Sequence, residues 1–278
     1  MKSKIDLHMH TNHSDGVLTP AELLAKVRSA ELTVFSVTDH DTVTGWREVN
    51  ALRVSGDAEL ISGTELSVRL ENDDIHILAY FFDPENREFN DALDFYQRKR
   101  SERGEEIVTR LQKMGLGITF ADVKQTALDG VIGRPHIAQT LHSLGLTNQY
   151  EEAFYKYIGN GGPAYVPKFM LAPKEAFDLV HRAGGIAVLA HPALGDMFRH
   201  LPELVAMGLD GIEALHYSHK PQDTRKAKLA AKEYNLVLSG GTDFHGRGLR
   251  EAPLGSINIP PEYIDQMKKR VQLYRSVS

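Results

Sequence analysis

The segment Ile5-Asp6-Leu7-His8-Met9-His10 lies near the N-terminus and indicates both the fold and the chemistry of this chain. Read as a β-strand, it places Asp6, His8 and His10 on one face and the apolar side chains on the other. Side chains on one face stand roughly 7 Å apart, close enough to converge on one ion. Burying imidazoles beside a carboxylate is costly unless they are hydrogen-bonded or hold a cation. The segment therefore predicts a metal site or, taken alone, histidines exposed on an edge strand.

Length and composition restrict the classes of protein to which the chain can belong. Its 278 residues suffice for one large α/β domain, or for such a domain with a smaller insertion. Because it has no cysteine, any metal must be held by nitrogen and oxygen. We find no signal-peptide pattern and no apolar run that could span a bilayer, so we expect a cytoplasmic protein without a membrane partner. The net charge of −5 disfavours binding to long DNA or RNA.

Helices and strands alternate along residues 1–85, as in an α/β domain. Thr19-Pro20-Ala21-Glu22 combines an N-cap, a proline at the first helical position and a capping-box glutamate, which predicts a helix to about Ala30. A second helix is expected at 46–54. The expected strands are 33–38, followed by Asp39-His40-Asp41; 59–62, followed by Gly63-Thr64-Glu65; and 74–80, which contains His76.

Residues 86–165 show a different pattern, without strand candidates, and are expected to form a helical insertion. Apolar residues at helical spacing predict a long helix from Phe89 to Met114. Shorter helices are expected at 121–128, 135–144 and 149–158, and the glycine cluster 159–163 is interpreted as a hinge or turn.

The α/β pattern resumes in residues 166–278, with helices expected at 173–183, 201–207 and 223–234 and a basic helix at the end. Strand 186–190 leads to His191, strand 211–215 to His216, Tyr217 and His219, and strand 236–242 to Asp243 and His245. In a barrel of parallel strands such chain segments meet at the C-terminal ends of the strands. The expected metal ligands are His8, His10, Asp15, His40, Glu65, His76, His191, Asp243 and His245.

This set of imidazoles and carboxylates is too large for one ion, which takes about four to six donors including water. A cluster of two or three ions bridged by a carboxylate such as Glu65 is therefore expected. Donors of this type suit Mn²⁺, Zn²⁺ or Fe²⁺, and clusters of this type hydrolyse phosphoesters. Asp6 is not needed as a ligand; it is expected either to orient a ligand imidazole or to form structural hydrogen bonds.

These motifs together resemble the PHP (polymerase and histidinol phosphatase) family. The matching segments are Asp6-Leu7-His8-Met9-His10, Ser14-Asp15-Gly16, Thr38-Asp39-His40-Asp41, Gly63-Thr64-Glu65, His76, Ala190-His191-Pro192 and Asp243-Phe244-His245. The resemblance implies an α/β fold, a distorted (β/α)7 TIM-like barrel with a small helical insertion domain. It also implies two or three divalent ions, Mn²⁺ foremost with Zn²⁺, Fe²⁺ and Mg²⁺ as alternatives.

The same resemblance implies how the ligands are shared. One ion would be held by His8, His10, Glu65 and Asp243, a second by Glu65, His76 and His191, and a third by Asp15, His40 and His245. The expected catalytic residues are Asp15, His40, His191 and His245. Protonation of the departing oxygen by His191 or His245 ranks low, because a metal-bound imidazole has no spare proton at its ligating nitrogen.

Basic residues in the insertion suggest where a substrate phosphate binds. Arg100 and Arg103 lie at i and i+3 on one face of the long helix, where they either grip phosphate together or form a solvated charged face. Arg134 and His136 flank Pro135 at a helix start, which is either an anion site or a structural cap. Both arrangements are similar to those of PHP phosphatases for 3′,5′-nucleotide bisphosphates and of related exoribonucleases.

We therefore expect a metal-dependent phosphoesterase that converts a nucleotide such as 3′-phosphoadenosine 5′-phosphate to AMP and phosphate, with 5′-to-3′ exoribonuclease activity on short RNA as a second activity. The alternatives are a histidinol-phosphate phosphatase and a catalytically silent metal-binding module. Hydrolysis of C–N bonds is disfavoured by the paired arginines and by the lack of a candidate bridging lysine. His216, Tyr217 and His219 would line a nucleoside pocket or belong to the loop surface. The sequence leaves the oligomeric state open.

Overall fold

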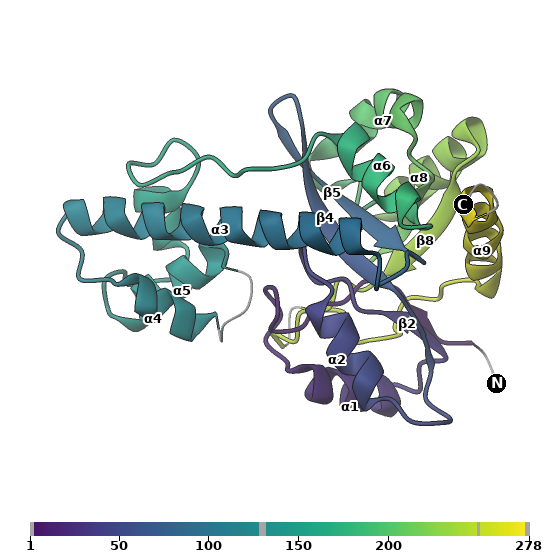
Figure 1. Ribbon diagram of the computed structural model, residues 1–278, viewed down its shortest axis with the longest axis horizontal. Coiled ribbons are helices and arrows are strands. Elements are labelled where there is room, and N and C mark those ends of the chain that lie inside the picture. Colours follow the sequence, from purple (N-terminus) through teal and green to yellow (C-terminus); the bar gives the residue numbers. More distant parts are fainter. Residues whose placement is uncertain (1–2, 128–131, 249–250, 276–278) are drawn as a thin grey trace.

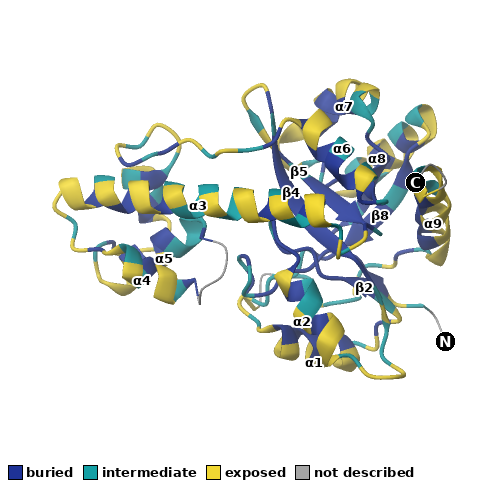
Figure 2. Ribbon diagram, viewed as in Figure 1, coloured by how far each residue is buried: buried dark blue, intermediate teal, exposed yellow. Residues whose placement is uncertain are grey.

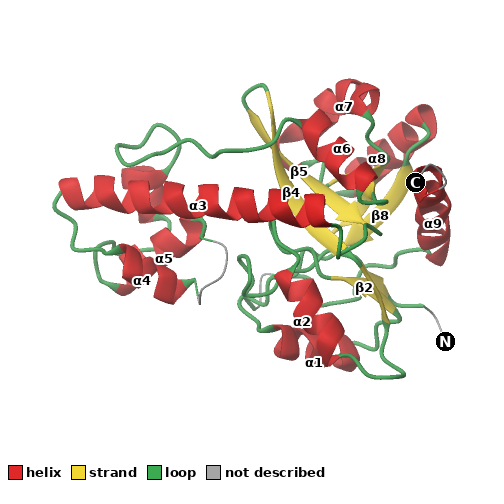
Figure 3. Ribbon diagram, viewed as in Figure 1, coloured by secondary structure: helices red, strands yellow, loops and turns green. Residues whose placement is uncertain are grey.

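The computed structural model describes residues 3–127, 132–248 and 251–275 as a mixed α/β fold (Figures 1 and 3). Three short parallel strands form one sheet in the order β1 (Ile5–Asp6), β2 (Val34–Ser36) and β3 (Glu59–Ile61). A second sheet runs in the order β4 (Gly63–Leu70), β5 (Asp73–Tyr80), β6 (Ile186–Leu189), β7 (Gly211–His216) and β8 (Val237–Gly241). Among the described residues neither sheet closes on itself.

Backbone contacts join the two sheets at the level of the predicted site. Leu7 N donates to Gly240 O at 3.2 Å, and Met9 forms an isolated parallel bridge with Phe244. A second parallel bridge joins His40 to Glu65. The segments that follow β1, β2 and β8 therefore lie next to one another although they are distant in the sequence.

Strand β4 is the main departure from the predicted secondary structure. Glu65 was expected directly after a strand, but it lies inside β4, which pairs antiparallel with β5; β5 in turn pairs antiparallel with β6. Only one residue, Ser62, separates β3 from β4, so the two strands resemble a single segment in the sequence. The alternation of Leu66, Val68 and Leu70 with more polar residues is the signal for β4.

Helices cover the outer faces of the sheets. The capping box predicted at Thr19 is present and opens α1 (Pro20–Ser29), which packs with α2 (Thr44–Leu52) beside the small sheet. The larger sheet is flanked by α6 (Pro173–Arg182), α7 (Leu201–Met207) and α8 (Pro221–Tyr234), and α9 (Pro261–Arg275) packs near β8 (Figure 1). None of the helices in the described part of the chain is long and apolar enough to cross a membrane.

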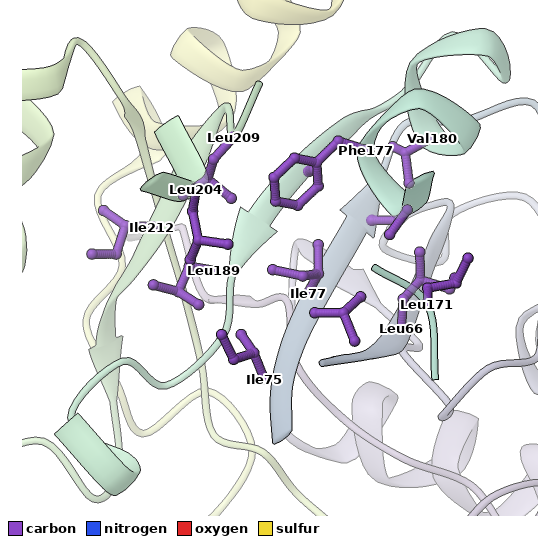
Figure 4. Close-up of a cluster of buried hydrophobic side chains, with 14 of the residues drawn as sticks. Leu66, Ile75, Ile77, Leu171, Phe177, Val180, Leu189, Leu204, Leu209 and Ile212 are labelled. Atoms are coloured by element: carbon purple, nitrogen blue, oxygen red, sulfur yellow. The ribbon is translucent and has the colours of Figure 1, made fainter. Parts of the chain in front are cut away.

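Residues on the strands of the larger sheet alternate between the core and the site. Leu66 on β4 and Ile77 on β5 point into a buried cluster that includes Phe177 of α6 (Figure 4). Glu65 and His76 are their neighbours along the strands and therefore point to the opposite face. Figure 2 shows these strands as a largely buried layer. Packing of the apolar face thus fixes the direction of the polar side chains.

The described residues between Tyr80 and Ile186 contain no strand, as the sequence predicted. They form α3 (Arg87–Lys113), α4 (Phe120–Thr126) and α5 (Arg134–Ser143), followed by a π-helical segment at Phe154–Ile158 in place of the longer helix expected from 149. The predicted end of one helix at residue 128 lies outside the described residues. Ile107, Leu111 and Ile137 belong to a hydrophobic cluster of this region alone, and α3 connects the region to the sheets (Figure 1).

Candidate metal centre and anion cavity

The carboxylate of Glu65 is the centre of the predicted ligand cluster. Its Oε2 atom lies 3.3 Å from a ring nitrogen of each of three histidines, His8, His10 and His40. Its Oε1 atom lies 3.0 Å from Nδ1 of His76 and 3.1 Å from Nε2 of His191. The side chain of Glu65 is 1% exposed, so both oxygens face imidazoles rather than solvent. Glu65 is therefore placed to bridge two positions.

Asp243 and Asp15 extend the cluster through contacts with further imidazoles. Asp243 Oδ1 lies 3.2 Å from Nε2 of both His8 and His10. Asp15 Oδ1 lies 3.1 Å from Nε2 of His245, and the rings of His10 and His245 stack with centroids 4.4 Å apart. All nine ligands predicted from the sequence therefore lie in one connected cluster.

Two cluster residues have left-handed backbone conformations that non-glycine residues rarely adopt. His191 follows β6 with φ of 28°, and Asp243 follows β8 with φ of 51°. Such strain is often concentrated at functional sites, where the surrounding structure maintains it. Here it turns the chain at the strand ends and directs the side chains into the cluster.

The unpartnered polar atoms of the cluster fit a cation. Several buried ring nitrogens and one carboxylate oxygen lie among polar neighbours but form no hydrogen bond of acceptable geometry: His10 Nε2, Asp15 Oδ1, His40 Nδ1, His191 Nδ1 and His216 Nε2. Four sets of donor atoms lie within 4.8 Å of one another: His8, His10, Glu65 and Asp243; His8, Glu213 and His216; His10, Asp15 and His245; and His40, Glu65 and His76. Buried groups of this kind are normally satisfied, so divalent ions held by nitrogen and oxygen account for them best.

The pKa values of the cluster residues also fit a bound cation. Burial opposes ionisation, yet the pKa of Glu65 and that of Asp243 are held well below the usual range by the surrounding imidazoles. Burial alone would lower the pKa of the His10 ring, but Asp243 and Glu65 raise it to about 10. At His40 burial dominates and lowers the pKa to about 3. The carboxylates thus remain charged and hold protons on nearby rings, which a bound cation would displace.

Of the two roles expected for Asp6, the structure shows structural hydrogen bonding. It accepts hydrogen bonds from Thr242 N at 2.9 Å, Thr242 Oγ1 at 2.7 Å and Gly255 N at 3.1 Å. Its contact with His8 is to the backbone amide and not to the imidazole. Asp6 therefore ties β1 to the end of β8 and does not orient a ligand ring.

Glu213 on β7 performs the orienting role and was not predicted. Its Oε1 atom lies 3.1 Å from His8 Nδ1, and its Oε2 atom accepts from His191 N at 2.7 Å. Both oxygens are therefore used to position two ligand residues. The signal in the sequence is a carboxylate between Ile212 and Ala214 in an otherwise apolar strand.

His216 belongs to the cluster, whereas Tyr217 and His219 do not. Ser218 N donates to His216 Nδ1 at 3.2 Å, which leaves Nε2 facing the cluster, 3.5 Å from Asp243 Oδ2. Tyr217 is 47% exposed, and His219 is held by the Ala214 carbonyl. The three residues therefore have different environments.

A basic cavity of about 190 Å³ opens beside the cluster, between α3 and the start of α5. Its wall contains Arg100, Arg103, Arg134 and His136 together with the ligands Asp15, His40 and His76. Arg100 is only 13% exposed and lies 3.1 Å from Asp41, so it is not on a solvated helix face. The predicted cationic residues therefore face the same space as the ligand cluster.

Local contacts position the cationic side chains of this cavity. Arg103 Nε donates to Val166 O at 2.8 Å, and Arg134 Nη1 donates to Asn160 Oδ1 at 3.0 Å. Gly133 N donates to His136 Nδ1 at 3.2 Å, so the neutral ring carries its proton on Nε2.

Lys168 is a further cation of the cavity that sequence reasoning missed. Its Nζ atom donates to Ser67 Oγ at 2.5 Å. Burial, with repulsion from Arg100, lowers the pKa of Lys168 to about 7, while Asp41 opposes the shift. No local pattern marks this lysine, because its neighbours in space come from β4 and α3.

A second cavity, of about 580 Å³, shares Asp15, Pro135 and His136 with the first. Its other lining residues are mostly neutral, among them Asn12, Gln139 and Tyr150, with Arg247 at one side. The ligand cluster therefore lies at the junction of a basic cavity and a larger, less charged one.

Fold and site together define an α/β protein that assembles imidazoles and carboxylates next to a basic cavity. The chain belongs to the PHP domain family, whose sequence model matches residues 6–233. It is 33% identical over 250 residues to a 5′-3′ exoribonuclease of Haemophilus influenzae, covering 88% of this chain and 91% of that protein.

Two further relatives cover almost the whole chain. A 3′,5′-nucleoside bisphosphate phosphatase of Chromobacterium violaceum is 31% identical over 266 residues, which is 93% of both proteins. A crystal structure from Bifidobacterium adolescentis, described as a metal-dependent phosphoesterase, has a TM-score of 0.85 at 30% identity and covers 96% of both chains. The similarity therefore includes the insertion as well as the sheets.

Proposed function

We propose that this protein is a metal-dependent phosphoesterase that hydrolyses phosphate esters of nucleotides. The observation that carries the proposal is the position of the ligand cluster, which shares one cavity with Arg100, Arg103, Arg134 and Lys168. A phosphorylated substrate needs both features, because cations bind its phosphates and metal ions activate the ester.

Two or three divalent ions would occupy the cluster. His8, His10, Glu65 and Asp243, which form one of the four donor sets, would hold one. Glu65, His76 and His191 would hold a second, and Asp15, His40 and His245 would hold a third. Mn²⁺ is the first choice that the resemblance to the PHP family implies; the oxygen and imidazole donors suit Mn²⁺, Zn²⁺ and Fe²⁺ alike, and Mg²⁺ is a further alternative. When bound, such ions lower the pKa of water and neutralise phosphate charge.

The residues of the chain bind and orient the substrate. Arg100, Arg103 and Arg134 would bind a phosphate group that is not hydrolysed, and His136 would donate a hydrogen bond from Nε2. Glu213 keeps the ring of His8 and the backbone of His191 in place. The scissile ester would then lie next to Glu65, where the ligand sets meet.

The substrates that fit this arrangement carry two phosphates at a short separation. A nucleoside 3′,5′-bisphosphate does so, and so does the 5′ end of a phosphorylated RNA. The relatives from Chromobacterium violaceum and Haemophilus influenzae are named for these two activities, which supports both substrates for this chain. As candidate substrates, we place the nucleoside bisphosphate and short 5′-phosphorylated RNA equally, and both ahead of histidinol phosphate.

We propose that separate parts of the chain hold the metal ligands and bind the substrate. Residues 1–85 and 166–278 would form the two parts of a distorted (β/α)7-type barrel that carries the ligands. Residues 86–165 would form the substrate-binding insertion, in keeping with their separate hydrophobic cluster.

A substrate panel on the metal-reconstituted protein tests the proposal. We expect turnover of nucleoside 3′,5′-bisphosphates and of short 5′-phosphorylated RNA, and little of plain mononucleotides. Turnover of histidinol phosphate alone would replace the proposal with that activity. Bound metal without turnover of any ester would instead identify a silent metal-binding module.

A further inference from the structure

Three aromatic side chains form a cluster at the surface outside the basic cavity, which we call the aromatic platform: the exposed Phe95 and Phe169, and Tyr96, which is half-buried and packs against the core. Phe95 is 37% exposed and Phe169 51% exposed, although both are large and apolar. The rings of Tyr96 and Phe169 are nearly parallel, with centroids 5.8 Å apart, and Phe95 meets Phe169 edge-on at 5.6 Å. The rings are thus already ordered against one another while much of their surface remains open.

Cationic side chains border the platform. The guanidinium carbon of Arg98 lies 6.0 Å from the Phe95 ring centroid, and Lys99 Nζ lies 5.7 Å from it. Lys99 also pairs with Glu102 at 2.7 Å, whereas Arg98 forms no ion pair within the described part of the chain. An open aromatic surface with a free cation beside it suits a ligand that has flat rings and negative charge.

The platform is continuous with the basic cavity. Phe169 directly follows Lys168, which lines the cavity. Tyr96 lies four and seven residues before Arg100 and Arg103, so these three side chains share one face of α3. In Figure 1 the connection from the insertion to α6 passes alongside α3, and Arg103 bonds to Val166 of that connection.

Resting on the function proposed above, we propose that the aromatic platform stacks bases of a single-stranded RNA whose 5′ end occupies the basic cavity. That cavity, at about 190 Å³, is smaller than the roughly 300 Å³ at which pockets for drug-sized ligands begin. It accommodates phosphate and sugar, and further nucleotides must lie outside it. Base stacking on aromatic rings is tolerant of sequence, as trimming of varied RNA ends requires.

Charge selects RNA over a second copy of this chain as the occupant. Although the chain as a whole carries a net charge of −5, Arg98 and the cavity cations attract a polyanion locally, whereas a second copy placed on the same surface would bring like charges together. The platform would therefore make affinity depend on RNA length without affecting a mononucleotide.

The test measures binding of two ligands to the full-length protein in chelator, so that nothing is hydrolysed. One is a single-stranded RNA of about ten nucleotides with a 5′ phosphate and a 3′ fluorophore, and the other is a nucleoside 3′,5′-bisphosphate. Phe169→Ala should raise the Kd for the RNA by roughly 5-fold to 100-fold and leave the Kd for the bisphosphate unchanged. Phe169→Trp should retain RNA binding, and Leu229→Ala, at a position on α8 that is 62% exposed, should change neither Kd.

Several outcomes would contradict the proposal that the aromatic platform binds RNA. An unchanged RNA Kd in Phe169→Ala would do so, as would an equal loss for both ligands, which would mean that Phe169 only supports Lys168. Sedimentation showing self-association that Phe169→Ala abolishes, with RNA binding intact, would identify an interface between copies. Hydrolysis by the metal-loaded protein is assayed separately, so its absence would refute the proposed function and not the binding surface.

Discussion

For Lys168, the pH dependence of substrate binding distinguishes the contribution of its positive charge from that of its side-chain volume. Its lowered pKa of about 7 means that the charge is present below neutral pH and is lost as the pH rises through 7. A charge-assisted hydrogen bond to a phosphate contributes about 1.5–3 kcal/mol, or roughly 10-fold to 150-fold in binding. We therefore expect Lys168→Ala to raise KM for a nucleoside bisphosphate by this factor at pH 6.

The same reasoning fixes the pH dependence. With a pKa of about 7, about nine-tenths of Lys168 is protonated at pH 6 and about one-tenth at pH 8. If the charged form of Lys168 binds phosphate about 10-fold to 150-fold more tightly, the ratio of KM between Lys168→Ala and the unaltered protein should therefore fall by about 5-fold to 9-fold between these pH values. Bound phosphate will shift the fall to somewhat higher pH, because an anion favours the protonated lysine.

The assay is initial-rate kinetics from pH 6 to 9 for the unaltered protein, Lys168→Ala and Lys168→Arg. Ratios between variants are compared, because ionisations of the metal cluster are common to all three and cancel. Arginine stays charged throughout, so Lys168→Arg should lose less affinity at high pH than the unaltered protein. A KM ratio for Lys168→Ala that stays constant with pH would refute the reasoning.

Three further variants separate substrate binding, metal binding and folding. Arg134→Ala should raise KM at least about tenfold with kcat little changed, because it removes a charged contact; an unchanged KM would mean that Arg134 serves only to hold Asn160. Glu65→Gln should keep the fold but lower both the number of bound ions and kcat, as measured by elemental analysis and turnover, because the ligands share this carboxylate. Asp6→Ala should lower stability by about 1–3 kcal/mol or more, since it leaves Thr242 donors buried without an acceptor; thermal unfolding would show this, and an unaltered Tm would contradict it.

The parts of the fold that the sequence predicts are those encoded locally. The capping box at Thr19 specifies α1 through contacts within four residues, and the structure confirms it. The periodic apolar residues of α3 and the lack of strands after Tyr80 are equally local. Strand β4 was missed because its direction depends on pairing with β5 and not on its own residues.

In the site, too, residues that belong to a local sequence pattern were predicted, and residues that depend on distant contacts were not. Seven of the nine predicted ligands follow the strands β1, β2, β6 and β8, so their convergence follows from how strands pack, whereas Glu65 and His76 lie inside the antiparallel pair β4 and β5. Glu213 and Lys168 have no such pattern. Glu213 contacts His8 across 205 positions of sequence, and Lys168 contacts Ser67 across 101. Residues whose role comes from one distant neighbour can be recognised only once the chain is folded.

The central claim is that the cluster around Glu65 holds more than one divalent ion. The most direct test is the number of ions bound per chain after equilibrium dialysis against Mn²⁺, measured by elemental analysis on the unaltered protein. We predict two or three ions per chain, in keeping with the ligand sets that share Glu65. A value of one or none under saturating metal would contradict the account.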